Sequence, residues 1–106
     1  MEKEQWTIQK HSKCIIKSKK IGKFNLTDIG FYGHNVLGVS LLENGSDYGN
    51  SGKGPVVKIK FLNAGCTQMY LNNQEVEEFV IEFRGMSERD QLATALELIV
   101  NELKKS

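Results

Sequence analysis

Hydrophobic and polar residues alternate along several short stretches of this chain, and the alternation predicts β-strands. In residues 56–61, Val57, Ile59 and Phe61 fall on one side of an extended chain and two lysines on the other. Residues 78–83 repeat this pattern. Other extended segments are predicted at residues 6–17, 23–27, 31–32, 36–42 and 66–71, with turns at 18–22, 28–30, 33–35, 63–65 and 72–75. Because the connections are short, the sheet is predicted to be antiparallel.

The end of the chain has a different period, which predicts one amphipathic helix over residues 87–105. Ser87 is a suitable N-cap, and Asp90 stands three residues later, as in a capping box. The apolar residues recur at spacings of four, three and four, which places them on one helical face. This apolar stripe consists of Leu92, Leu96, Ile99 and Leu103. A terminal helix of this kind is expected to bury its stripe against the sheet.

These elements predict a single domain over residues 1–106, of mainly β (α+β) class. About seven antiparallel strands would form a bent sandwich or barrel, and the C-terminal helix would cap one end. Residues 43–55 contain several glycines and the only proline, so they are predicted to form a long flexible surface loop. A chain of 106 residues is large enough to fold alone.

Composition narrows the class of protein further. The chain is 40% hydrophobic and 25% charged, with a formal net charge of +1, and nucleic-acid binders usually carry a larger basic excess. We therefore expect no nucleic acid as a partner. The N-terminus lacks the apolar segment of a signal peptide, and an intracellular, cytoplasmic location is expected. Cys14 and Cys66 are expected to be small buried hydrophobes, although a bridge between them stays open.

The sequence offers little support for catalysis, nucleotide binding or a metal. Residues 49–53 resemble part of a phosphate-binding loop, but Asp47 and Gly54 break the required spacing. Structural zinc sites usually show two close ligand pairs, and the chain has one. The candidates for such a site are His11, Cys14, His34 and Cys66. We expect a non-catalytic protein without a cofactor or metal.

The order of elements resembles that of pleckstrin-homology-like domains, including GRAM domains. Two stretches carry the resemblance. Residues 22–32 are similar to the second and third strands of the family, with a glycine before "x-apolar-x-Leu-Thr", a turn and an aromatic pair. Residues 78–103 are similar to its end, where "Phe-x-Ile-x-Phe" leads through a short loop to "Ser-Glu-Arg-Asp" and a helix. The chain would be a divergent member, because Leu96 or Ile99 stands where the family helix carries a tryptophan.

The resemblance implies two alternative ligands. The first is a protein partner, docked as an added strand in a groove between the helix and residues 66–71. The rim of this groove would be formed by Gln68, Tyr70, Arg84 and Arg89. The second is a phosphoinositide or another anionic membrane lipid, bound peripherally at a lysine-rich loop over residues 17–23. This loop would present Lys17, Lys19, Lys20 and Lys23.

Partner docking is the first expectation and lipid binding the alternative. The simplest other interpretation of both residue sets is ordinary solvated surface. The oligomeric state stays open at this level.

Overall fold

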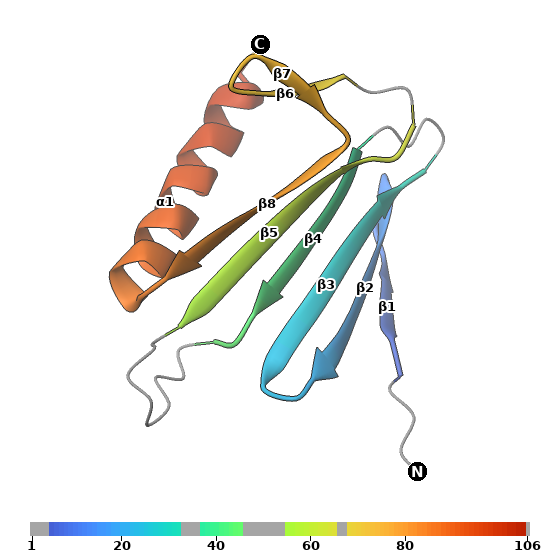
Figure 1. Ribbon diagram of the computed structural model, residues 1–106. Helices are drawn as coiled ribbons and strands as arrows, with labels where there is room; N and C mark the ends of the chain where they lie inside the picture. The colour runs from blue at the N-terminus through green and yellow to red at the C-terminus, as the bar shows by residue number, and fades with distance from the viewer. Residues whose placement is uncertain (1–4, 33–36, 46–54, 66–67, 106) are drawn as a thin grey trace.

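The computed structural model describes residues 5–32, 37–45, 55–65 and 68–105, and within them the chain is mainly β (Figure 1). In these ranges, eight strands precede one C-terminal helix. The strands are β1 (Thr7–Lys10), β2 (Cys14–Ile21), β3 (Phe24–Phe31), β4 (Leu37–Glu43), β5 (Val56–Asn63), β6 (Met69–Leu71), β7 (Gln74–Val76) and β8 (Glu78–Arg84), and the helix is α1 (Met86–Leu103).

Six strands form one antiparallel sheet in the order β1-β2-β3-β4-β5-β8, and β6 and β7 form a separate hairpin. The predicted fold class is therefore confirmed: a mainly β, antiparallel chain that ends in a helix. The structure has one strand more than the roughly seven expected, because the segment before β8 folds back on itself. Asn72 and Asn73 make this possible, since both adopt positive φ angles, 54° and 68°, as a type I′ turn requires.

The predicted turn at residues 18–22 is wrong, because β2 continues to Ile21. Ile21 is paired with Phe24, so the turn consists of Gly22 and Lys23 alone. Gly22 has a φ of 62°, which glycine adopts without steric cost. Lys19 and Lys20, which suggested a solvated turn, are instead part of β2, where successive side chains point to opposite faces of the sheet.

Two other strand boundaries also differ from the prediction. The predicted turn at 28–30 is part of β3, which is paired with β2 along its whole length. The predicted segment 6–17 is divided into β1 and β2 by a short turn, in which the His11 N–H donates to the Cys14 carbonyl at 2.9 Å. Both differences arise because pairing with a neighbouring strand overrides local turn preference.

The helix begins at Met86, and its N-cap is Gly85 rather than Ser87. Gly85 has a φ of 122°, and its N–H donates to the Pro55 carbonyl at 2.8 Å. This bond to the start of β5 sets where the helix can begin. No side chain makes a capping hydrogen bond, so the predicted box of Ser87 and Asp90 does not form.

Strand register divides the sheet into two faces. We call the face that carries Glu43, Ile59 and Ile81 the inner face, because α1 is tied to it through Glu43. The inner face is mainly apolar and includes Ile16, Ile29, Leu41, Ile59, Phe61, Phe79, Ile81 and Phe83. The opposite, outer face is richer in charged side chains, and includes Lys17, Asp28, Ser40, Lys58, Lys60 and Glu82.

The fully buried part of the core is small. Among the described residues, the buried positions are Cys14, Pro55, Val56 and Val57. The thiol of Cys14 is free, in agreement with its expected role as a small hydrophobe. Phe61 and Phe79 stack across β5 and β8 with ring centroids 5.1 Å apart. Most of the inner face is therefore only half-buried.

Some predicted features lie outside the described residues. These are the greater part of the loop at 43–55, the turn around His34, and Cys66 with its neighbour. At the border of the loop, Asn44 and Val56 are joined by two hydrogen bonds. The Val56 N–H donates to Asn44 Oδ1 at 2.8 Å, and the Asn44 N–H donates to the Val56 carbonyl at 3.3 Å.

Candidate functional site

One ion pair fixes the beginning of α1 to the sheet. Arg89 Nη1 donates to Glu43 Oε1 at 3.0 Å, with the Glu43 side chain only 18% exposed. The same carboxylate accepts from the Gly45 N–H at 2.6 Å and from Asn25 Nδ2 at 3.2 Å. Burial raises the pKa of Glu43, but the three hydrogen bonds and the Arg89 charge outweigh it and lower that pKa below 4.5.

Beyond this anchor, the apolar stripe of α1 is less buried than the sequence predicts. Leu92 is half-buried, whereas Leu96 is 42%, Ile99 52% and Leu103 75% exposed. The helix contacts the sheet mainly through β8, the strand from which it departs. The prediction that the helix buries its stripe is therefore wrong for its C-terminal half, because only the first turns are held close to the sheet.

One residue on the inner face of β8, the strand that α1 follows, is also exposed. Ile81 lies in the middle of β8 and is 39% exposed. We call Ile81, Leu96, Ile99 and Leu103 the apolar surface. Isolated exposed hydrophobic residues are normal, but several on adjoining elements are typical of an interaction site.

The structure separates the four residues predicted to line a partner groove. Gln68 precedes β6 and Tyr70 lies within it, and both are exposed. Arg84 ends β8 and pairs with Glu82, while Arg89 is engaged by Glu43. The β6–β7 hairpin, which carries Tyr70, adjoins the first residue of β8, whereas Arg84 is the last residue of that strand (Figure 1). Arg84 and Arg89 stand on either side of Gly85 in the chain, but Arg84 lies on the outer face beside Glu82 and Arg89 is bound to Glu43 on the inner face, so the four residues do not form one rim.

The four lysines predicted to bind lipid also separate. Lys17 and Lys19 lie on the outer face of β2, and Lys20 on the opposite side of the same strand. Lys23 is exposed in the turn. Lys19 Nζ lies 4.5 Å from the centroid of the Trp6 ring, a cation–π contact. The four side chains therefore do not share one loop.

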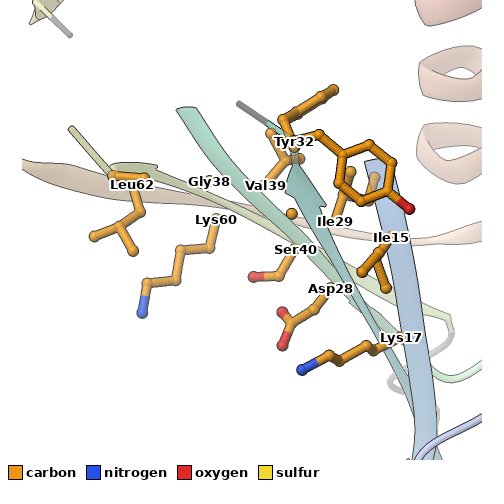
Figure 2. A pocket seen from close by; sticks show the side chains of 13 residues that line it. Ile15, Lys17, Asp28, Ile29, Tyr32, Gly38, Val39, Ser40, Lys60 and Leu62 are labelled. Carbon is orange, nitrogen blue, oxygen red and sulfur yellow. The ribbon is translucent and has the colours of Figure 1, made fainter. Parts of the chain in front are cut away.

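The outer face has a shallow pocket of about 600 Å³ (Figure 2). A polar row crosses its floor, because strand pairing places Asp28 beside Lys17 and beside Ser40, and Ser40 beside Lys60. Gly30 and Gly38 leave space where side chains would stand, and Ile15 and Tyr32 are apolar parts of the lining.

Sequence reasoning missed this pocket. The alternation along residues 56–61 indicated that Lys60 is on a polar face, but nothing in the sequence indicated which strand would lie beside it. Chemically, the one carboxylate of Asp28 offsets half of the positive charge that Lys17 and Lys60 bring to the described lining. The arrangement suits a small polar ligand or ordered water. None of the described residues that line it is a cysteine or histidine that could act as a nucleophile beside a base.

The part of the chain that the structure describes holds neither a candidate metal cluster nor a candidate membrane-spanning helix. No group of three or more His, Cys, Asp or Glu residues there could hold a metal ion. No helix in these residues is long and apolar enough to cross a bilayer.

Comparison of the chain with protein-family models, curated proteins and solved structures found no match. The geometry of the described residues is what distinguishes the candidate functions.

Proposed function

We propose that this protein is a non-catalytic, intracellular interaction module of pleckstrin-homology-like type, which docks a polypeptide partner on its apolar surface. The observation that carries this proposal is the exposure of Leu96, Ile99 and Ile81 on two adjoining elements. A helix stripe that remains in water loses the burial that stabilises most protein helices. A docked polypeptide would supply that burial.

The anchor at Arg89 supports the same function. It holds the first turns of α1 at the sheet while the following turns keep their apolar residues accessible. Helix and sheet together present a broad apolar surface whose position is set by a charged hydrogen bond. A partner would find this surface already formed, which lowers the ordering cost of binding.

Site-directed photocross-linking tests the proposal. A benzophenone amino acid at Ile99 should form covalent adducts with a polypeptide in cells that express the chain. The matched control is the same group at Glu97, an exposed position two residues away and thus on nearly the opposite side of the helix. Absence of adducts at Ile99, or equal adducts at both positions, would contradict partner docking on this surface.

Anionic lipid is a second candidate, favoured by one observation. Strand β2 places Lys17 and Lys19 on the same outer face, with Lys58 and Lys60 on β5 of that face. Several lysines on one face attract an anionic membrane surface. Glu82 and Glu78 lie within 4 Å of the two β5 lysines and offset part of their charge, which is why the lipid function ranks second.

A further inference from the structure

Strand β8 is at the border of the six-stranded sheet. It is paired with β5 on one side, and no other described strand is paired with it. Val80 and Ile81, at its centre, are 52% and 39% exposed. An edge strand with exposed apolar side chains is a template for pairing with another strand. The border of β8 is therefore a candidate interface, continuous with the apolar surface on α1.

The sequence of β8 is complementary to itself when read in the opposite direction. If two copies pair antiparallel about Ile81, this residue lies opposite its own copy and Phe79 lies opposite Phe83. At the ends, Glu78 lies opposite Arg84. A two-fold axis imposes this antiparallel arrangement, because an isologous interface uses the same surface twice.

The charges favour this register over its neighbours. Slipping by two residues in one direction places Glu82 opposite its own copy, and slipping in the other places Glu78 opposite Glu82. Like charges directly opposite each other are destabilising in antiparallel pairs. Slipping by a single residue would turn Phe79 and Phe83 toward the wrong face. The register centred on Ile81 places Phe79 opposite Phe83 and Glu78 opposite Arg84, leaves Val80 opposite Glu82, and, unlike either two-residue slip, has no two like charges opposite each other.

The exposed area of the chain is also large enough for such an interface. A compact monomer of 12.0 kDa exposes about 6,000 Å² by the usual scaling of surface with mass. This chain exposes 8277 Å². The half-covered inner face contributes to the difference. A typical stable interface buries about 800 Å² per partner, well within the difference.

We infer that the polypeptide docked on the apolar surface is a second copy of this chain, joined through antiparallel pairing of β8 with β8. This inference rests on the proposed function and names its partner. The two sheets would form one continuous sheet with both copies of α1 on its inner face. Leu96 and Ile99 of each copy would then be covered at the two-fold axis.

Charge reversal at the ends of β8 tests the inference on the purified full chain. Analytical ultracentrifugation should give twice the 12.0 kDa mass for the parent. Glu78→Lys or Arg84→Glu alone places like charges opposite each other at both symmetric ends, and each should weaken the dimer about tenfold or more. The double variant restores opposite charges and should recover the affinity of the parent.

A matched control separates this effect from a general change of charge. Glu97→Lys makes the same acid-to-base change on an exposed part of α1 and should leave the dimer intact. The side chains of Glu78 and Arg84 are 54% and 56% exposed, so both single variants should fold and keep the parent's circular dichroism.

Two outcomes would overturn the inference. One is a dimer whose affinity neither single reversal changes, which would rule out this register. The other is a parent that sediments as a monomer at millimolar concentration. If that monomer still forms adducts at Ile99 with a different polypeptide, the second copy is excluded while the proposed docking function stands. If the parent neither forms a dimer nor gives adducts at Ile99, the proposed docking function is excluded as well.

Discussion

Arg89 on α1 donates a 3.0 Å hydrogen bond to Glu43 at the end of β4, and this contact joins residues 46 positions apart in the chain. It holds the first turns of the helix over the inner face. The Arg84–Glu82 pair is formed by neighbours on one strand and is largely exposed. The two arginines were expected to share a role at a groove rim, but their contacts differ in kind.

We expect Arg89→Ala to lower the free energy of unfolding by about 1–3 kcal/mol, because a charged hydrogen bond to a mostly buried carboxylate is lost. Urea unfolding measures this change. In a double-mutant cycle, Glu43→Gln and Arg89→Ala should be strongly non-additive. Lys105→Ala, which breaks an exposed ion pair with Glu102, is the control and should change the free energy of unfolding by less than about 0.5 kcal/mol. Additive effects at residues 43 and 89 would show that the ion pair contributes nothing to stability.

Stability should fall with acid in a window set by Glu43. The pKa of this carboxyl is lowered in the folded state, so the native protein binds fewer protons than the unfolded chain. The stabilisation is complete above the ordinary value of 4.5 and is lost as the pH falls through the lowered pKa. Urea unfolding between pH 7 and pH 3 should show a shallower decline for Glu43→Gln than for the parent. Parallel profiles would contradict this role.

Gly85→Ala should destabilise the protein by about 1–3 kcal/mol. Gly85 has a φ of 122°, and an added Cβ would overlap the Glu88 carboxylate. Thermal or urea unfolding measures the loss. The double variant with Glu88→Ala removes the overlap. It should recover the stability lost to that overlap but not the stability lost to the unfavourable φ angle at residue 85. Gly30→Ala, at a site with open space, is the control and should change stability by less than about 0.5 kcal/mol.

Vesicle co-sedimentation tests the lipid alternative. If anionic lipid binds the outer face, the parent should sediment with phosphatidylserine or phosphoinositide vesicles, and Lys17→Glu with Lys19→Glu should abolish this. The expected loss is about fivefold or more per lysine. Lys20→Glu is a matched control, because Lys20 lies on the opposite side of β2. A parent that stays in the supernatant, or an equal loss in the control, would exclude lipid binding at this face.

The candidate surfaces were only partly predictable. The lysines and arginines were visible in the sequence, but their grouping was not. Lys17 and Lys20 are three residues apart, and whether they share a surface depends on whether β2 continues through them, as it does. Asp28 entered no predicted site, because its neighbours Lys17 and Ser40 are set by the pairing of three strands.

The helix was likewise only partly predictable from the sequence. Its apolar spacing predicted residues 87–105, within two residues of the observed Met86–Leu103 at either end. Its cap was predicted at Ser87 from local preference alone. The chain instead begins the helix after Gly85, because the Gly85 N–H is held by the Pro55 carbonyl from a different strand. A contact between residues 30 positions apart has no local sequence signal.

The sequence by itself determined the class of the fold: short alternating strands joined antiparallel and one terminal amphipathic helix. These features follow from periodicity among near neighbours, which sterics and solvent impose locally. Only the tertiary structure decided which side chains meet, how far α1 covers the inner face, and that Ile81 and Ile99 remain accessible. Those properties depend on strand register and on the distance between helix and sheet, and both arise from contacts between residues far apart in the chain.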